Sequence, residues 1–309
     1  MAEVVGSTGG LAPPRRLVAA QPASAAGWLA GLPESAERLL ARFDLTLDRL
    51  AAPGGRASVA LLVRRADGGR ATLKLLAPGA RDEPAPAVLE AAALRRWDGL
   101  GAVRVLDAAP EEGALLLERL RGETSLRSLP DAKATLEALS TLRRLWVAPG
   151  EGHPFPSVER RTAAELGALR AAVDGAAGPL VEQALAVRDA LLADRPEEVL
   201  LHGDFRQGAV LASDGERAPW LAVGPEPVVG ERAFDLARLV RDRLHDLLAS
   251  PGAPAITRRR VAKLAGTVEA DPDRVRGWAL YRGVASGVRQ LAAGRRADGE
   301  ALLEFASWL

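Results

Sequence analysis

The stretch Leu200–Leu211, LLHGDFRQGAVL, holds the residues whose types and spacing suit chemistry best. An apolar run enters a His-Gly-Asp turn and a second apolar run leaves it, so His202 and Asp204 are predicted to lie in a loop between two strands. An aspartate in such a loop is a candidate general base. The alternative is a buried turn whose aspartate is satisfied by hydrogen bonds, and the surrounding sequence must decide between the two.

A second apolar segment and a helix start follow this turn. Trp220–Val223 is predicted to be a strand after a Ser-Asp-Gly turn. The sequence Phe234-Asp235-Leu236-Ala237 then opens a helix, and an aspartate at a helix N-cap accepts backbone N–H bonds.

The front of the chain favours a sheet with one embedded helix. Residues 1–23 are predicted to be a loose arm, and 24–43 a helical segment that breaks near Pro33 and starts anew at Ser35. The predicted strands are 45–50, 58–65, 70–76, 102–107 and 114–118, with an Asp-Gly hairpin turn between the second and third and a helix at 86–97. Lysine is rare in this chain, yet Lys74 falls in one of these strands, and Glu90 is the only carboxylate in the helix candidate.

The back of the chain is predicted to be mostly helical from about residue 122 onward. The helix candidates are 131–147, 158–173, 178–193, 232–248, 256–267, 272–293 and 298–308. The apolar, glycine-rich stretch 199–230 interrupts them.

Composition excludes several classes of protein. Of the 309 residues, 48% are apolar and 26% charged, as in ordinary globular proteins, and the formal net charge of +1 argues against a nucleic-acid partner. No apolar run reaches the roughly 18–20 residues of a membrane helix. Cysteine is absent, which excludes disulfides and thiolate nucleophiles, and the N-terminus lacks the pattern of a signal peptide, so we expect a cytoplasmic protein.

Several stretches, in their order along the chain, resemble the aminoglycoside and hydroxyurea phosphotransferases, and the streptomycin 6-kinase branch in particular. In that family a loop His-Gly-Asp-x-x-x-x-Asn is followed by a hairpin that ends in a metal-binding Asp and by an Asp-Leu-Ala helix start. Supporting stretches are APPRRLVAA near the start, RRWDGLGAVRVLDA at 95–108, GALLLERLRGETSL at 113–126 and PVVGERAFDLARLVRDR at 227–243.

The resemblance covers nearly the whole chain and implies an α+β, protein-kinase-like bilobal fold with a small β-rich N-lobe and a large helical C-lobe. We expect an N-terminal arm and helix at 1–44, the N-lobe at 45–120, and the C-lobe at 121–309 with the catalytic-loop insert at 199–230.

The resemblance also implies roles for residues. Lys74 would hold the phosphates of ATP and Glu90 would hold Lys74, although an exposed lysine and a solvated glutamate are the alternative. Asp204 would be the catalytic aspartate. The remaining implied roles are structural or nucleotide-facing: His202 and Asp235 as supports of the loop, and Glu118 to Leu120 as the hinge whose backbone meets adenine. The glycine-bearing turn 53–58 lies where a phosphate-covering loop belongs.

Two departures from the family pattern fall on the metal ligands. The position of the loop asparagine is Ala209, and the position of the hairpin aspartate is Gly224. These two positions supply the side-chain oxygens that hold Mg²⁺ against the phosphates, and Ala and Gly have none. We therefore expect Mg²⁺ not to bind, and ATP to bind weakly or without metal.

Three nearby groups leave alternatives open. Glu226 could reach toward a metal or be a solvated loop acid. Arg206 could bind nucleotide without metal or be a surface arginine. The family's acceptor pocket lies among the C-terminal helices, where the candidates are Trp278, Tyr281, Arg282, Arg289 and Gln290; the arginines argue against a cationic substrate.

Three hypotheses for the function follow. The first is a pseudokinase that acts as a ligand-binding or regulatory protein in specialised metabolism. The second is an active ATP-dependent small-molecule O-phosphotransferase that uses Glu226 or an unusual metal arrangement. The third is a kinase fold reused for metal-independent chemistry with Asp204 as base. Each implies a small-molecule ligand and neither nucleic acid nor membrane, and the first also admits a protein partner.

Overall fold

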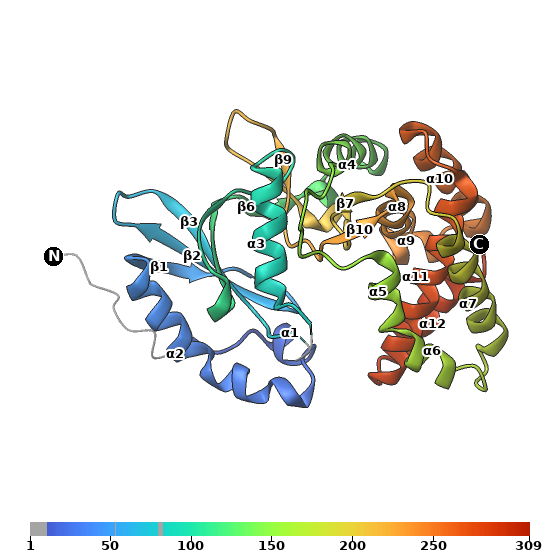
Figure 1. The fold of residues 1–309 in the computed structure, drawn as a ribbon, viewed down its shortest axis with the longest axis horizontal. Coiled ribbons are helices and arrows are strands. Elements are labelled where there is room, and N and C mark those ends of the chain that lie inside the picture. Colours follow the sequence, from blue (N-terminus) through green and yellow to red (C-terminus); the bar gives the residue numbers. More distant parts are fainter. Residues whose placement is uncertain (1–10, 53, 80–82) are drawn as a thin grey trace. The chain divides into compact units, whose positions relative to one another are not determined.

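The computed structural model describes residues 11–52, 54–79 and 83–309. Internal contacts divide the chain into two units (Figure 1). Unit 1 comprises Met1–Thr124 and Leu211–Leu221, and unit 2 comprises Ser125–Val210 and Ala222–Leu309.

Unit 1 is built on a five-stranded antiparallel sheet with the strand order β1-β2-β3-β5-β4. Its elements are α1 (Arg15–Val18), η1 (Ala23–Ala25), α2 (Ala26–Arg42), β1 (Leu45–Leu50), β2 (Ser58–Arg65), β3 (Arg70–Leu76), α3 (Pro86–Trp97), β4 (Val105–Ala109), η2 (Pro110–Glu112) and β5 (Ala114–Glu118). The predicted hairpin is present, with β2 and β3 paired from Ser58↔Leu76 to Arg64↔Arg70.

The two faces of this sheet carry different side chains because strand residues alternate between faces. On β3, Ala71, Leu73 and Leu75 belong to a core cluster that also contains Leu32, Ala36 and Leu39 of α2. Lys74 lies between two of these core residues along the strand and therefore points to the other face. On that face it meets Glu90 of α3, so strand periodicity and helix position together create the ion pair described below.

Three predictions about unit 1 are wrong in detail. Residues 11–23 are not a loose arm, because Leu11 and Leu17 are buried in the same core. The helix does not break at Pro33 but continues through it from Ala26 to Arg42, since burial of its apolar face offsets the backbone hydrogen bond that proline cannot make. The strand predicted at 102–107 is β4 at Val105–Ala109.

Unit 2 is mainly helical. Its elements are η3 (Leu126–Ser128), α4 (Asp131–Leu145), α5 (Val158–Ala163), α6 (Leu166–Ala171), α7 (Gly178–Ala193), β7 (Val199–Leu201), η4 (Gln207–Ala209), β10 (Val228–Gly230), α8 (Arg232–Val240), α9 (Leu244–Leu248), α10 (Ala253–Val268), α11 (Pro272–Ala292) and α12 (Arg296–Ala306). The long helix α11 packs against α7, α8 and α12. Strands β7 and β10 form an antiparallel pair. A further sheet, in the order β6-β8-β9, consists of β6 (Arg121–Ser125), β8 (Val210–Ala212) and β9 (Trp220–Ala222), and most of its residues belong to unit 1.

Two predicted helices of unit 2 are each divided. The segment 158–173 consists of α5 and α6, and Glu165 at the break binds both Tyr281 and Arg289. The segment 232–248 consists of α8 and α9, because Arg243 adopts a left-handed backbone with φ 55°. From that position Arg243 donates to the Gln207 side chain and to the Leu129 carbonyl, so tertiary contacts set the break. No helix in the described part of the chain is long and apolar enough to cross a membrane.

Candidate functional site

The His-Gly-Asp turn follows β7, as predicted, and its shape requires glycine. Gly203 has φ +81°, and a Cβ atom at this position would lie 1.8 Å from the carbonyl oxygen of Glu226. Glu226 in turn donates its backbone N–H to the His202 carbonyl at 2.9 Å. The loop is therefore pressed backbone to backbone against the segment that precedes β10.

Asp235 holds this loop through its backbone amides. One carboxylate oxygen accepts the His202 N–H at 2.9 Å, and the other accepts the Gly203 N–H at 2.8 Å. The Trp146 indole also donates to Asp235, at 3.2 Å. The N-cap of α8 is Glu231, so Asp235 lies in the first turn of the helix and not at its N-cap, which corrects the sequence prediction while keeping the supporting role.

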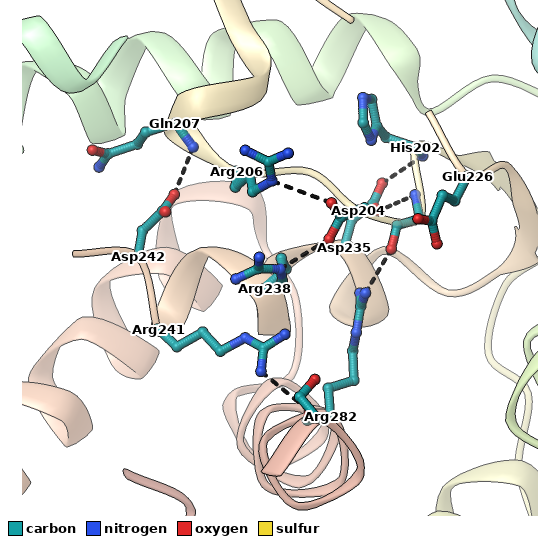
Figure 2. Close-up of polar contacts among 12 residues, drawn as sticks. His202, Asp204, Arg206, Gln207, Glu226, Asp235, Arg238, Arg241, Asp242 and Arg282 are labelled. Atoms are coloured by element: carbon teal, nitrogen blue, oxygen red, sulfur yellow. Dashed lines mark hydrogen bonds and ion pairs between the residues drawn. The ribbon is translucent and has the colours of Figure 1, made fainter. Parts of the chain in front are cut away.

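Asp204 is bound on both carboxylate oxygens by arginines (Figure 2). Arg238 donates through Nε to Oδ1 at 2.9 Å, and Arg206 donates through Nε to Oδ2 at 3.2 Å. Burial alone would raise the pKa of Asp204, but the charges of Arg238, Arg206 and Arg282 outweigh it and hold that pKa well below its usual range. Asp204 is therefore ionised at neutral pH and is a weak proton acceptor.

His202 is fully buried, and its Nε2 lies 3.2 Å from the Val223 carbonyl oxygen. Its ring meets Phe205 edge to face, with the ring centroids 5.3 Å apart. Burial lowers the pKa of His202, so the ring is neutral near pH 7. These contacts match the scaffold role that the sequence implied.

The two positions that lack a metal ligand are neighbours in space. The Val223 N–H donates to the Ala209 carbonyl at 2.9 Å, which places Ala209 beside the residue that precedes Gly224. Ala209 is buried, and Gly224 has a positive φ of 64°. The backbone therefore brings the two positions together, but neither offers a side-chain oxygen.

Neither alternative for Glu226 describes it fully. Its side chain is half exposed and forms an ion pair with Arg161 of α5. It is thus neither a simple solvated loop acid nor an uncommitted metal ligand. Arg206, predicted to be either a nucleotide ligand or a surface arginine, is partly exposed and is committed to Asp204.

In unit 1, Lys74 and Glu90 form the predicted pair. The ammonium group lies 2.7 and 2.6 Å from the two carboxylate oxygens, and the exposed fractions of the side chains are 13% for Lys74 and 1% for Glu90. The alternative of an exposed lysine and a solvated glutamate is therefore wrong. A buried, bidentate pair of this kind fixes the direction in which the ammonium group points.

The predicted hinge residues are also in unit 1, at the end of β5. Glu118 accepts from the Arg104 backbone N–H at 2.7 Å and from Arg217 at 2.5 Å, so its side chain ties together segments of that unit. Leu120 is buried, and its carbonyl accepts from the Gly122 N–H at 3.0 Å. Pro53, at the start of the predicted phosphate-covering turn, lies outside the described residues.

Sequence reasoning missed the cationic partners of this loop. Arg161 and Arg238 were not singled out, because an arginine-rich chain gives no signal as to which arginine points inward. Arg282 was proposed for an acceptor pocket, but it donates to the carbonyls of Gly203 and Phe234, at 2.6 and 2.9 Å. Trp278 and Tyr281, proposed for the same pocket, are buried in helix packing and bind Glu231 and Glu165 there.

Comparison with known proteins identifies the family. Residues 44–294 match the family model described as aminoglycoside/hydroxyurea antibiotic resistance kinase. The chain belongs to this family. A streptomycin 6-kinase of Streptomyces glaucescens is 36% identical over 258 residues, which cover 82% of this chain and 81% of that protein. A hydroxyurea phosphotransferase of Kitasatospora aureofaciens is 37% identical over 266 residues, which cover 82% of this chain and 71% of that protein.

Solved structures agree with the bilobal kinase-like α+β fold. The crystal structure of aminoglycoside phosphotransferase APH(4)-Ia matches with a TM-score of 0.60 and 19% identity, covering 89% of this chain and 97% of the other. A fructosamine-3-kinase described as putative, from Thermobifida fusca, matches with a TM-score of 0.57 and 19% identity, covering 88% and 97%. At this identity the matches establish the fold alone.

Membership of a kinase family implies ATP and a divalent metal, and the residues present can be tested against the metal. Among residues 11–52, 54–79 and 83–309, no three His, Cys, Asp or Glu side chains come together as a metal site. Of the acids near the loop, Asp204 and Glu226 are bound by arginines, and Asp235 and Asp242 accept backbone N–H groups of the loop. A magnesium ion prefers several oxygen ligands, so these carboxylates could hold one only by giving up the contacts described above.

Proposed function

We propose that this member of the kinase family is a pseudokinase, which binds a small-molecule ligand without magnesium-dependent phosphoryl transfer and serves a ligand-binding or regulatory role. The observation that carries the proposal is the hydrogen bonding of the Asp204 carboxylate. Both of its oxygens are engaged by Arg238 and Arg206, while Ala209 and Gly224 offer nothing in place of the two metal-binding side chains. The fold is kept, and the means of holding a metal against phosphates is not.

The expected loss of catalytic rate without the two metal-binding side chains supports this assignment. Removing one preorganised group that stabilises transition-state charge costs about 10²–10³ in rate. Losing two such groups, if the effects roughly add, removes on the order of 5–8 kcal/mol of transition-state stabilisation. Glu226 is a poor replacement because its ion pair with Arg161 would have to break first.

The same electrostatics argue against metal-independent chemistry with Asp204 as base. General base catalysis is most effective when the pKa of the base lies near the working pH. Three arginines lower the pKa of Asp204 far from that range. A proton taken up by Asp204 would also break its contacts with Arg206 and Arg238.

An active ATP-dependent phosphotransferase is the second candidate. It is supported by the Lys74–Glu90 pair and by the names of the relatives, which are kinases. Its cofactors would be ATP and a metal ion held in an arrangement other than the family's.

A turnover assay distinguishes the two candidates. ADP formation is followed with ATP, Mg²⁺ and either streptomycin or hydroxyurea as acceptor, with Asp204→Asn as the control. We expect no acceptor-dependent ADP from the wild-type protein. Acceptor-dependent turnover that Asp204→Asn abolishes would establish the phosphotransferase instead.

A further inference from the structure

Arg241 is a buried arginine whose hydrogen bonds are incomplete. It lies at the C-terminal end of α8, and its side chain is directed toward α11 (Figure 2). One nitrogen donates to the Arg282 carbonyl at 3.3 Å, while Nε is buried without a hydrogen-bond partner. A buried donor without an acceptor costs free energy, so its presence needs an explanation.

Arg241 is surrounded by further positive charge. Arg238 is three residues earlier on α8 and so shares its face of the helix, and Arg282 and Arg289 are on α11. Burial, together with Arg238 and Arg282, lowers the pKa of Arg241 well below its usual range. Burial and the charge of Arg238 lower the pKa of Arg282 to about 10, against the attraction of Asp204.

The cluster formed by Arg206, Arg238, Arg241 and Arg282 is not neutral. The carboxylates that act on it are Asp204, Asp235 and Asp242, so four guanidinium groups face three acids. Arg161 is matched by Glu226, and Arg289 by Glu165. Asp242, which lies just after α8, is also under the influence of the charges of Arg238 and Arg206, although it accepts the Gln207 N–H and pairs with Arg127. Asp131 faces Arg243 and Arg260.

The arginines keep donors for an additional acceptor. Arg206 and Arg238 each bind Asp204 through Nε, which leaves the two Nη nitrogens of each fork for other oxygens. Arg282 is anchored on the carbonyls of Gly203 and Phe234 and lies over the Phe234 ring, 4.3 Å from its centroid. Both Arg206 and Arg238 are partly exposed, so a ligand can reach them from solvent.

We propose that Arg206, Arg238, Arg241 and Arg282 form a binding site for the phosphate group of a small molecule. A phosphate supplies negative charge to a cluster in which guanidinium groups outnumber carboxylates, and arginine forks match the geometry of phosphate oxygens. This inference rests on the proposed function, because it assigns the region around Asp204 to binding and not to transfer. The arginines then supply the positive charge that a metal supplies elsewhere.

The test is a thermal-unfolding titration with inorganic phosphate, a phosphate monoester such as glycerol 3-phosphate, and ATP without Mg²⁺. Sodium chloride at equal ionic strength is the reference. We expect the melting temperature of the wild-type protein to rise with the phosphate-bearing compounds beyond the chloride reference. A larger response to the ester than to inorganic phosphate identifies an organic phosphate as the ligand, and the reverse identifies free phosphate. No response to any of the three overturns the proposal.

Variants place the site on the named residues. Arg206→Gln, Arg282→Gln and Arg241→Met should each weaken phosphate binding by about 10- to 100-fold, the range expected for a lost charge-assisted hydrogen bond. Arg276→Gln is the matched control, since Arg276 is an exposed arginine of α11 that pairs with Asp273, and it should bind as the wild type does. Equal phosphate binding by all four variants would show that the phosphate site lies elsewhere in the protein.

The melting temperature of Arg241→Met without ligand is a second readout, because it distinguishes a ligand-binding arginine from one that serves only the fold. Because it removes an incompletely bonded buried charge and keeps most of the side-chain stem, we expect its melting temperature without ligand to equal or exceed that of the wild type. A large loss of stability would assign Arg241 a structural role, and the exposed Arg206→Gln then tests the site alone. Absence of phosphate binding with no ATP turnover overturns only this inference, whereas magnesium-dependent turnover overturns the proposed function.

Discussion

At the scale of single residues, the candidate site is defined by which charges are paired. Asp204, for which the sequence predicts the position of the catalytic aspartate, has its two oxygens occupied by Arg238 and Arg206. Lys74 and Glu90 form the ion pair that the family resemblance predicts for the nucleotide side. The chain therefore contains one of the predicted charged pairs and surrounds Asp204 with arginine.

Removing one partner of the Lys74–Glu90 pair should destabilise the fold because Glu90 is buried and Lys74 is largely shielded from water. Glu90→Gln leaves the ammonium group without its counter-charge and should lower the free energy of unfolding by about 3–5 kcal/mol in urea titrations. Arg65→Gln on β2 is the control, because its pair with Asp67 is exposed and should matter by less than about 1 kcal/mol. Equal effects of the two substitutions would mean that Lys74 is solvated in solution.

Asp204 should make stability depend on pH in a defined direction. Its native pKa lies below the unperturbed value of 3.8, so the ionised group stabilises the fold at neutral pH, and this stabilisation is lost as the pH falls below about 4 through the native pKa. Asp204→Asn should lower the free energy of unfolding by about 1.5–3 kcal/mol at pH 7. Urea titrations at pH 7, 5, 4 and 3 should show the difference from wild type narrowing only below pH 4. A difference that is the same at pH 7 and pH 3 would contradict the assignment.

At the scale of elements, the loop is held by backbone contacts that tolerate little change. Asp235 in the first turn of α8 accepts the amides of His202 and Gly203, and the segment before β10 closes against Gly203. These contacts fix the shape of the loop.

A comparison of Gly203→Ala with Gly68→Ala measures how much the close backbone contact at Gly203 matters to stability. Both glycines have nearly the same φ, +81° and +80°, so both substitutions carry the strain of a left-handed alanine, about 1–2 kcal/mol. Only at Gly203 does the new Cβ meet backbone, whereas at Gly68 no heavy atom lies within 4 Å. Gly203→Ala should therefore lower the free energy of unfolding by about 1–3 kcal/mol more than Gly68→Ala. Equal effects in denaturant titrations would show that the loop is free to move away.

The sequence predicts elements well where local patterns decide them. The β2–β3 hairpin follows from its alternating apolar residues and Asp-Gly turn, and the Lys74–Glu90 pair follows from the family resemblance. Tertiary contacts decide the other features, such as the helix break at Arg243 and the continuation of α2 past Pro33. The partners of Asp204 belong to this second group, because Arg238 and Arg206 are two of many arginines and only the folded chain brings them to one carboxylate.

At the scale of the whole molecule, the proposed function separates family membership from activity. The match to the aminoglycoside/hydroxyurea antibiotic resistance kinases covers residues 44–294. Ala209 and Gly224, at which the family resemblance predicts metal ligands, nevertheless carry no side-chain oxygen. The different chemistry that we propose for this site fits the general rule that function is set by the site and not by the fold.

Restoring the two metal ligands tests the central claim most directly. The substitutions Ala209→Asn and Gly224→Asp are combined in one variant, and Asp is one of the residues that tolerate the positive φ of Gly224. The melting temperature of each protein is then measured with ATP, with and without Mg²⁺. We expect the wild-type protein to respond to ATP equally in the presence and absence of Mg²⁺, and the double variant to gain a response that requires Mg²⁺. Stabilisation of the wild-type protein by ATP only when Mg²⁺ is present would contradict the pseudokinase assignment.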